Sequence, residues 1–399
     1  MNTAPPGNPE QDRAAMIQEL RKGGAIVSEE VAAAFSAVPL HDPLPQTLNP
    51  ACDLGLAAAP GGDFCGAGVV SDVEMRAVML EQAQIERGMK VLAVGSGGYT
   101  AALVAELVGA TGQVTTVDAD LDLTSRAAAF LRTTGYSKVR VSTADTKHLV
   151  PEQSPFDRIV VRTDAWDIPP AWIDSLTPVG RIVVPLRFAG VARVIAFDRT
   201  PGNRVLTAQS YRLGSAITMS DCPEEHSIPL TRDAALRLDP QHTPQFHLPA
   251  LRHALHEPPI ECWTGIACDM PDELQLFLLT TARPQLPVLQ VSQEIVDHGL
   301  FVASARYGVP VFIEGGSFAY PSIRPKPDVG IGYETSVIAH GPEAHKVADR
   351  LNALINEWAR GRFKRGDARV RYRPKTADSG DLAGWRAIKQ YGVLTVDWP

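Results

Sequence analysis

The chain has 399 residues, a formal net charge of −7, 45% hydrophobic residues and 21% charged residues. These values are ordinary for a soluble globular protein, the length suggests two domains, and the acidic balance gives no reason to expect nucleic-acid binding. No apolar run approaches the ~20 residues of a membrane span, and the polar start of the chain lacks the core of a signal peptide. We therefore expect a cytoplasmic protein that does not contact a membrane.

The cysteines and histidines form no metal or disulfide pattern that we can identify. Five cysteines in a long chain are not the framework of a small disulfide-rich domain. Cys262 and Cys268 are too far apart for a CxxC motif, and the five histidines between residues 226 and 256 match no metal-binding spacing. We expect no metal ion, and we interpret these histidines as scattered residues of a polar linker.

Helical patterns come first along the chain. Residues 13–22 form a short periodic stretch that stops at two glycines, and residues 28–38 begin with a serine and two acids, which are typical of a helix start. Residues 39–68 are rich in proline, glycine and alanine, so we expect a long loop there. Ser71 then opens a third predicted helix over residues 71–86.

A strand, a glycine turn and a helix follow in the order that a nucleotide-binding unit needs. The apolar run 91–94 stops at Gly95, Gly97 and Gly98, and an Ala/Leu/Val-rich helical pattern continues from there. Such a turn lets a ligand approach the backbone, and the helix start presents unpaired N–H groups to it. Roughly 20 residues later a second strand ends in Asp118, which is either a surface acid or the residue that accepts the hydroxyls of a ribose.

Strand and helix patterns then alternate up to residue 185, which predicts a parallel sheet covered on both faces. Two β patterns without a helix between them follow, and we expect them to form an antiparallel pair at the edge of the sheet. The predicted strands are 91–94, 114–117, 139–142, 159–161 and 181–185, the predicted helices between them are 100–108, 120–131 and 170–176, and the antiparallel pair is 191–197 with 205–213.

The composition changes near residue 220, where proline, histidine and charged residues become frequent. We predict an α/β domain with amino-terminal helices over residues 1–219, a linker over 220–259, and an α+β module over 260–399. The elements expected in the module are strands at 260–266, 309–313, 315–320, 336–339, 370–372 and 393–398, and helices at 273–281 and 345–360.

In its first part the sequence resembles the protein L-isoaspartate O-methyltransferase family, over roughly the first 215 residues. The motifs that carry this likeness are Ala37-Val38-Pro39, Val70-Ser71, Gly95-Ser-Gly-Gly-Tyr99, Ala144-Asp145, Pro155-Phe-Asp157 and Gly180-Arg-Ile-Val-Val-Pro185. The module resembles the longer actinobacterial branch found beside ribosomal-peptide clusters, often labelled FxLD-system methyltransferases, through Cys262-Trp-Thr-Gly265, Glu314-Gly-Gly-Ser-Phe-Ala-Tyr320 and His340-Gly-Pro342.

The resemblance implies a Rossmann-like methyltransferase domain that takes its methyl group from S-adenosylmethionine, followed by an α+β module that holds a peptide. It implies a peptide or protein substrate, expected to be the precursor of a lanthipeptide or a related product, modified on aspartate or isoaspartate. The residues that it assigns to the donor are the turn Gly95, Ser96 and Gly97 for the methionine portion, Asp118 for the ribose, and Asp145 with Thr146 for the adenine.

Two residues are candidates for the substrate. The resemblance places Ser71 at the hydroxyl residue that contacts the substrate carboxylate, while its position before a periodic run also fits a helix N-cap. Arg162 follows a strand at the edge where ligands bind in α/β sheets, and it can pair with a carboxylate or form an ordinary surface ion pair. A carboxylate nucleophile is already ionised at pH 7, so no general base is required.

The chain departs from the family pattern at the donor site. An acid is usual before the glycine turn, where this chain has Ala93, the turn is one residue shorter, and Thr146 replaces a glycine. These departures leave open a binding or scaffold protein with this fold that takes no donor. A general isoaspartate repair enzyme is a further alternative.

Overall fold

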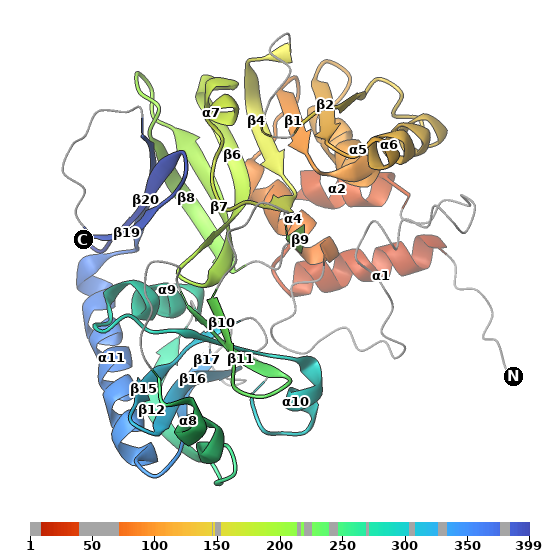
Figure 1. The fold of residues 1–399 in the computed structure, drawn as a ribbon. Helices are drawn as coiled ribbons and strands as arrows, with labels where there is room; N and C mark the ends of the chain where they lie inside the picture. Colours follow the sequence, from red (N-terminus) through yellow and green to blue (C-terminus); the bar gives the residue numbers. More distant parts are fainter. Residues whose placement is uncertain are drawn as a thin grey trace, which may run out of the picture.

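Five parallel strands form one half of a ten-stranded mixed sheet (Figure 1). The structure is a computed structural model, and it describes residues 9–39, 72–145, 147, 153–213, 217–218, 226–238, 246–268, 271–302, 308–325, 333–375 and 384–399. The parallel strands lie in the order β3 (Arg140–Thr143), β2 (Gln113–Asp118), β1 (Lys90–Val94), β4 (Phe156–Val161) and β6 (Leu176–Phe188). The predicted α/β fold with a parallel sheet is confirmed.

The antiparallel half of the sheet begins with the predicted pair, β7 (Val191–Arg199) and β8 (Leu206–Leu213), which is also confirmed. The expected position of this pair at the edge of the sheet is wrong, because three more strands follow β8. β18 (Arg369–Pro374) pairs with β8 through Arg371 and Tyr372, and β20 (Gly392–Asp397) and β19 (Trp385–Ile388) follow. The last strands of the chain therefore extend the sheet that its first half builds.

The central strands are buried on both faces, as their continuous apolar runs predict. A hydrophobic core lies on each face of the sheet. Ile159 and Val161 of β4 belong to the first core, and Val160 belongs to the second. In β6, Ile182 belongs to the first core and Val183 to the second. The second core is completed by α1 (Pro9–Lys22), α2 (Glu29–Ala37), α4 (Asp72–Ala83), α5 (Gly97–Val108) and α6 (Leu121–Thr133). The first core is completed by α7 (Pro170–Asp174), α9 (Pro271–Thr281), α11 (Ala344–Arg365) and the final strands.

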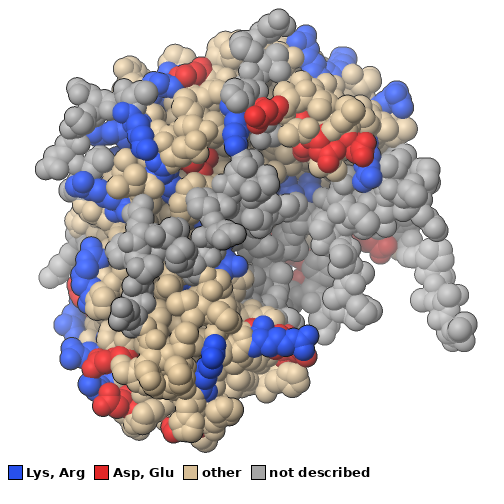
Figure 2. All heavy atoms as spheres, viewed as in Figure 1, with Lys and Arg blue, Asp and Glu red and all other residues tan. Residues whose placement is uncertain are grey.

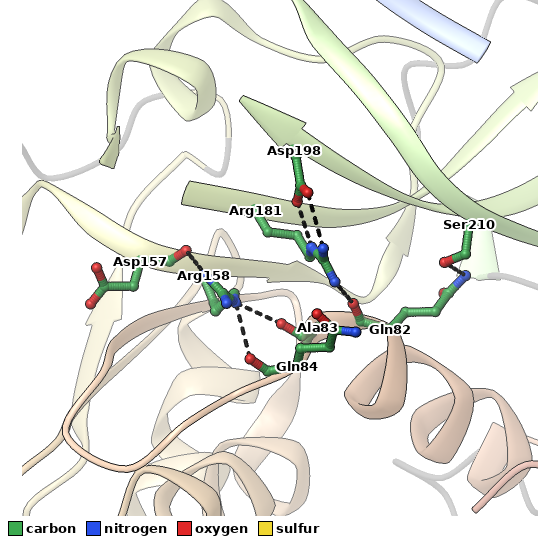
Figure 3. A network of polar contacts seen from close by, with 8 residues as sticks. All are labelled: Gln82, Ala83, Gln84, Asp157, Arg158, Arg181, Asp198 and Ser210. Carbon is green, nitrogen blue, oxygen red and sulfur yellow. Dashed lines mark hydrogen bonds and ion pairs between the residues drawn. The ribbon is translucent and has the colours of Figure 1, made fainter. Parts of the chain in front are cut away.

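Two arginines hold the carboxyl end of α4 against the sheet (Figure 3). Arg158 Nε donates to Ala83 O at 2.6 Å, and Arg181 Nη1 donates to Gln82 O at 2.8 Å. Arg181 also forms a bidentate ion pair with Asp198 of β7, with N–O distances of 2.6 and 3.0 Å. The last carbonyls of a helix have no partner within the helix, so these bonds satisfy them and fix α4 on β4, β6 and β7.

The remaining part of the chain, in the lower half of Figure 1, builds two four-stranded antiparallel sheets. Helix α11 packs on the second of these sheets through Val347, Leu351 and Ile355, and it leads up to β18. The first sheet consists of β10 (His226–Pro229), β11 (Ala234–Leu238), β13 (Val288–Val291) and β14 (Val309–Pro310). The second consists of β12 (Ile260–Cys268), β17 (Tyr333–His340), β16 (Ser317–Pro325) and β15 (Phe312–Glu314), and the helices α8 (Leu248–Ala254) and α10 (Gln293–Asp297) lie in this part.

The expected linker over residues 220–259 contains ordered elements, namely β10, β11 and α8. β11 alternates buried and half-buried residues between Ala234 and Leu238, but the surrounding prolines and histidines hide this pattern in the composition. Because β18–β20 join the large sheet, residues 260–399 do not form a sheet system of their own. The division of the chain into domains at residues 219 and 259 remains a prediction.

Charged side chains of both signs are interspersed over the described part of the face shown in Figure 2. Among the described residues, no helix is long and apolar enough to cross a membrane.

Candidate functional site

The glycine turn lies at the carboxyl end of β1, as predicted. Gly95 and Gly97 have φ angles of +59° and +60°, which residues with a side chain rarely adopt. The Gly95 N–H donates to Val117 O at 2.8 Å, which ties the turn to β2. A Cβ on Gly98 would lie 2.7 Å from the Phe130 ring, so this glycine allows α5 to approach α6 closely. A Cβ on Gly97 would meet nothing within 4 Å, so the turn borders open space on that side.

Ser96 lies between the two glycines at the N-cap of α5, and its side chain makes no capping hydrogen bond. Its Oγ lies 3.1 Å from Thr116 Oγ1 instead, and the residue is buried. The first N–H groups of α5 therefore stay available to a ligand, as the start of a helix allows. The side chain of Ser96 thus contacts Thr116 and helps to hold the turn in place. The predicted contact between Ser96 and a cofactor remains a prediction.

Asp118 ends β2 beside this turn. Val117 is the register partner of Val94, so Asp118 and Gly95 are the next residues of two neighbouring strands. Asp118 is half-buried, and within the described part of the chain its Oδ1 accepts one hydrogen bond, from Asp120 N at 3.0 Å. The other carboxylate oxygen remains for a ligand.

The remaining residues predicted to bind the methyl donor come after β3, the strand next to β2. Ala144, directly after β3, donates its N–H to Asp118 O at 2.9 Å, which places Asp145 next to the end of β2. Asp145 is exposed, and its Oδ1 accepts from Lys147 N at 2.9 Å. Thr146 and the predicted substrate residue Ser71 lie outside the described residues.

Arg162 follows β4 on the opposite side of the turn. Its N–H donates to Val94 O at 2.9 Å, so it lies at the same edge of the sheet as Gly95. The residue is only 6% exposed, so a substrate carboxylate would meet a largely covered side chain. The predicted pairing with substrate stays a prediction.

Sequence reasoning missed two residues of the segment that follows β4. Thr163 opens the two-residue strand β5 (Thr163–Asp164), which pairs with β9 (Ile217–Thr218), and its side chain lies against Gly95. Asp167 accepts hydrogen bonds from Tyr372 Oη at 2.6 Å, from Ile168 N at 2.8 Å and from Tyr391 N. No local pattern marks either residue, because both act through partners that are distant in sequence.

The carboxylate of Asp167 joins the final strands to this segment. Burial raises its pKa above the ordinary value, and hydrogen bonds from Tyr372, Tyr391 and Ile168 oppose that shift. Lys389 adds a second link, because its Nζ donates to Arg187 O at 2.6 Å and lies 3.3 Å from the centre of the Trp166 ring. The carboxy-terminal strands thereby fix the segment that borders the candidate site.

The arrangement fits a nucleoside ligand. The strand order reverses between β1 and β4, and such a reversal opens a crevice at the carboxyl ends of the strands where ligands bind in α/β sheets. An open glycine turn, the start of α5 and the carboxylate of Asp118 meet there. The described residues contain no group of three or more His, Cys, Asp or Glu side chains arranged to hold a metal ion.

Comparison with known proteins identifies the family. The family model described as Protein-L-isoaspartate(D-aspartate) O-methyltransferase matches residues 11–211. The chain belongs to this family. The matched residues extend from α1 to β8 and so include the glycine turn and Asp118.

Two relatives support the same assignment. The protein-L-isoaspartate O-methyltransferase of Methanopyrus kandleri is 36% identical over 176 residues, which are 44% of this chain and 76% of the relative. That of Ignicoccus hospitalis is 36% identical over 179 residues, or 44% of this chain and 82% of the relative. A solved structure named protein-L-isoaspartate O-methyltransferase is 18% identical and aligns over 90% of this chain and 96% of its own, with a TM-score of 0.42.

Proposed function

We propose that this protein is an S-adenosylmethionine-dependent carboxyl O-methyltransferase that acts on aspartate or isoaspartate in a peptide, and that its substrate is a ribosomally made precursor. The observation that carries the proposal is that the open glycine turn lies beside Asp118, next to the point where the strand order reverses. The chain that holds this site belongs to the isoaspartate methyltransferase family.

The residues at this edge suit an adenosyl donor. The turn at Gly95 and Gly97 would face the methionine portion, Asp118 the ribose and Asp145 the adenine amino group. A Cβ at position 97 would project into open space, so a ligand can come close to the backbone there. When bound, the donor supplies an electrophilic methyl group on a sulfonium.

The protein's part in the reaction is alignment and exclusion of water. The substrate carboxylate is ionised at pH 7 and attacks without a base. Ser71 would donate one hydrogen bond to it and set its direction. Methylation converts the carboxylate into an ester whose methoxy group leaves more readily than an oxygen of the free acid. The next backbone amide nitrogen of the peptide can then attack the ester carbonyl, expel methanol and close an aspartimide, which water opens to isoaspartate or aspartate.

Between the large sheet's β8 and β18 the chain builds two further four-stranded sheets with their helices, a part longer than a linker requires. We assign the peptide to this part, which the resemblance to the precursor-modifying branch supports. General isoaspartate repair is the second candidate, because the relatives above carry the isoaspartate name.

The two candidates differ in their preferred substrate. The full chain is incubated with S-adenosylmethionine and either precursor peptides encoded beside its gene or a synthetic isoaspartyl peptide, and products are read by mass spectrometry. Gain of about 14 Da (methyl ester) or loss of about 18 Da (aspartimide) on a precursor supports the first candidate. Methylation of the isoaspartyl peptide alone supports repair. If the protein also fails to bind S-adenosylhomocysteine at millimolar concentration, both give way to a binding protein without a donor.

A further inference from the structure

Thr163 lies at the point where the strand order reverses. It follows the carboxyl end of β4, and its neighbour Arg162 bonds to Val94 at the end of β1. A Cβ built on Gly95 would lie 2.6 Å from Thr163 Cγ2 and 3.5 Å from its Oγ1. The threonine side chain therefore packs directly against the glycine turn, at the edge of the sheet where β1 and β4 end.

The hydroxyl of Thr163 has no hydrogen-bond partner within the described part of the chain, although Oγ1 is shielded from solvent. Pairing of β5 with β9 uses backbone groups and leaves this hydroxyl unsatisfied. A buried polar group without a partner is destabilising, so such a group at the edge of a binding crevice calls for a ligand. The residue as a whole is only half-buried, and a change of rotamer about Cα–Cβ would carry the hydroxyl to the position that the methyl group occupies here.

The positions of the three strand ends indicate which part of a donor Thr163 would meet. Asp118, Gly95 and Thr163 end or follow β2, β1 and β4, which are neighbours in that order. Neighbouring strands lie about 4.8 Å apart, so Asp118 and Thr163 are about 10 Å apart across the sheet. With the ribose at Asp118, a sulfur-linked amino-acid chain that crosses the glycine turn ends at β4.

We propose that the Thr163 hydroxyl binds the amino-acid group of the donor, as a positioning contact at the end opposite Asp118. This rests on the proposed donor site. The hydroxyl can accept from the ammonium or donate to the carboxylate, and either bond satisfies the buried Oγ1. Thr163 would thereby select ligands that carry the amino acid over those that end at the sulfur.

The test uses two ligands and matched variants of the full chain. S-adenosylhomocysteine carries the amino-acid group, and 5′-methylthioadenosine lacks it. Thr163→Val removes the hydroxyl and keeps the shape, and Thr163→Ser keeps the hydroxyl. Thr177→Val is the matched control: Thr177 Oγ1 is also buried without a partner in the described structure, but it lies at the amino end of β6, the opposite edge of the sheet.

In calorimetry, Thr163→Val should weaken the binding of S-adenosylhomocysteine about tenfold, which is the effect of one charge-assisted hydrogen bond. The affinity for methylthioadenosine should not change. Thr163→Ser and Thr177→Val should bind like the wild type, and both valine variants should melt no lower than it without ligand. Equal affinity of wild type and Thr163→Val for S-adenosylhomocysteine, or an equal loss for both ligands, overturns the assignment of Thr163. A wild-type protein that binds neither ligand overturns the donor site itself.

Discussion

His340 offers a stability prediction that can be worked out in numbers. It ends β17 with 0% exposure, and neither ring nitrogen has a hydrogen-bond partner among the described residues. Its ring stacks on Phe318 with 4.7 Å between centroids and 13° between planes. Burial lowers the pKa of His340 from 6.5 to about 4. The folded protein therefore keeps this imidazole neutral well below pH 7.

The sign of the effect follows from proton binding. Between pH 6.5 and about 4 the unfolded chain binds a proton at His340 that the folded protein does not bind. The stability contribution is thus complete above pH 6.5 and is lost as the pH falls through this window. From pH 7 to pH 5 the loss from this one group is about 2 kcal/mol, because one pKa unit corresponds to about 1.4 kcal/mol.

The perturbation is His340→Phe, which keeps a ring against Phe318 and removes the titrating group. Urea denaturation at pH 7 and pH 5 gives the loss of unfolding free energy for each protein. The loss should be about 2 kcal/mol smaller in the variant than in the wild type. His256→Phe, at an exposed position, should keep the wild-type loss. Equal losses in wild type and His340→Phe would refute the reasoning.

Two further predictions concern the links of the site. Tyr372→Phe removes the 2.6 Å hydrogen bond to the buried Asp167 and should lower the unfolding free energy by about 2 kcal/mol. Tyr136→Phe removes a 2.7 Å hydrogen bond to a carboxylate on the surface and should lower the unfolding free energy by less than about 1 kcal/mol. Similar effects of the two substitutions in urea denaturation would contradict the role of Asp167 in joining the final strands to the site. Asp118→Asn should weaken the binding of S-adenosylhomocysteine about tenfold in calorimetry, since a charge-assisted hydrogen bond is lost. The exposed Asp122→Asn should not, and an unchanged affinity of Asp118→Asn would remove the ribose role.

The sequence alone determined the local order of the first half of the chain. The apolar run 91–94 is too short for a helix and is stopped by glycines, which indicates a short buried strand. The positive φ angles at Gly95 and Gly97 are what those glycines permit. Ser28 before two acids predicted the start of α2, and its Oγ accepts from Val31 N at 3.2 Å. Such signals depend on neighbours within a few residues, so they can be read without a structure.

The tertiary structure decided what crosses long distances along the chain. β18 beside β8, Tyr372 on Asp167, and Thr163 against Gly95 join residues between 68 and 205 positions apart. Strand patterns specify that a strand forms, but not which edge it joins, because every free edge offers the same backbone groups. A buried carboxylate or hydroxyl likewise has no pattern of its own, since its role comes from the partners that packing brings to it.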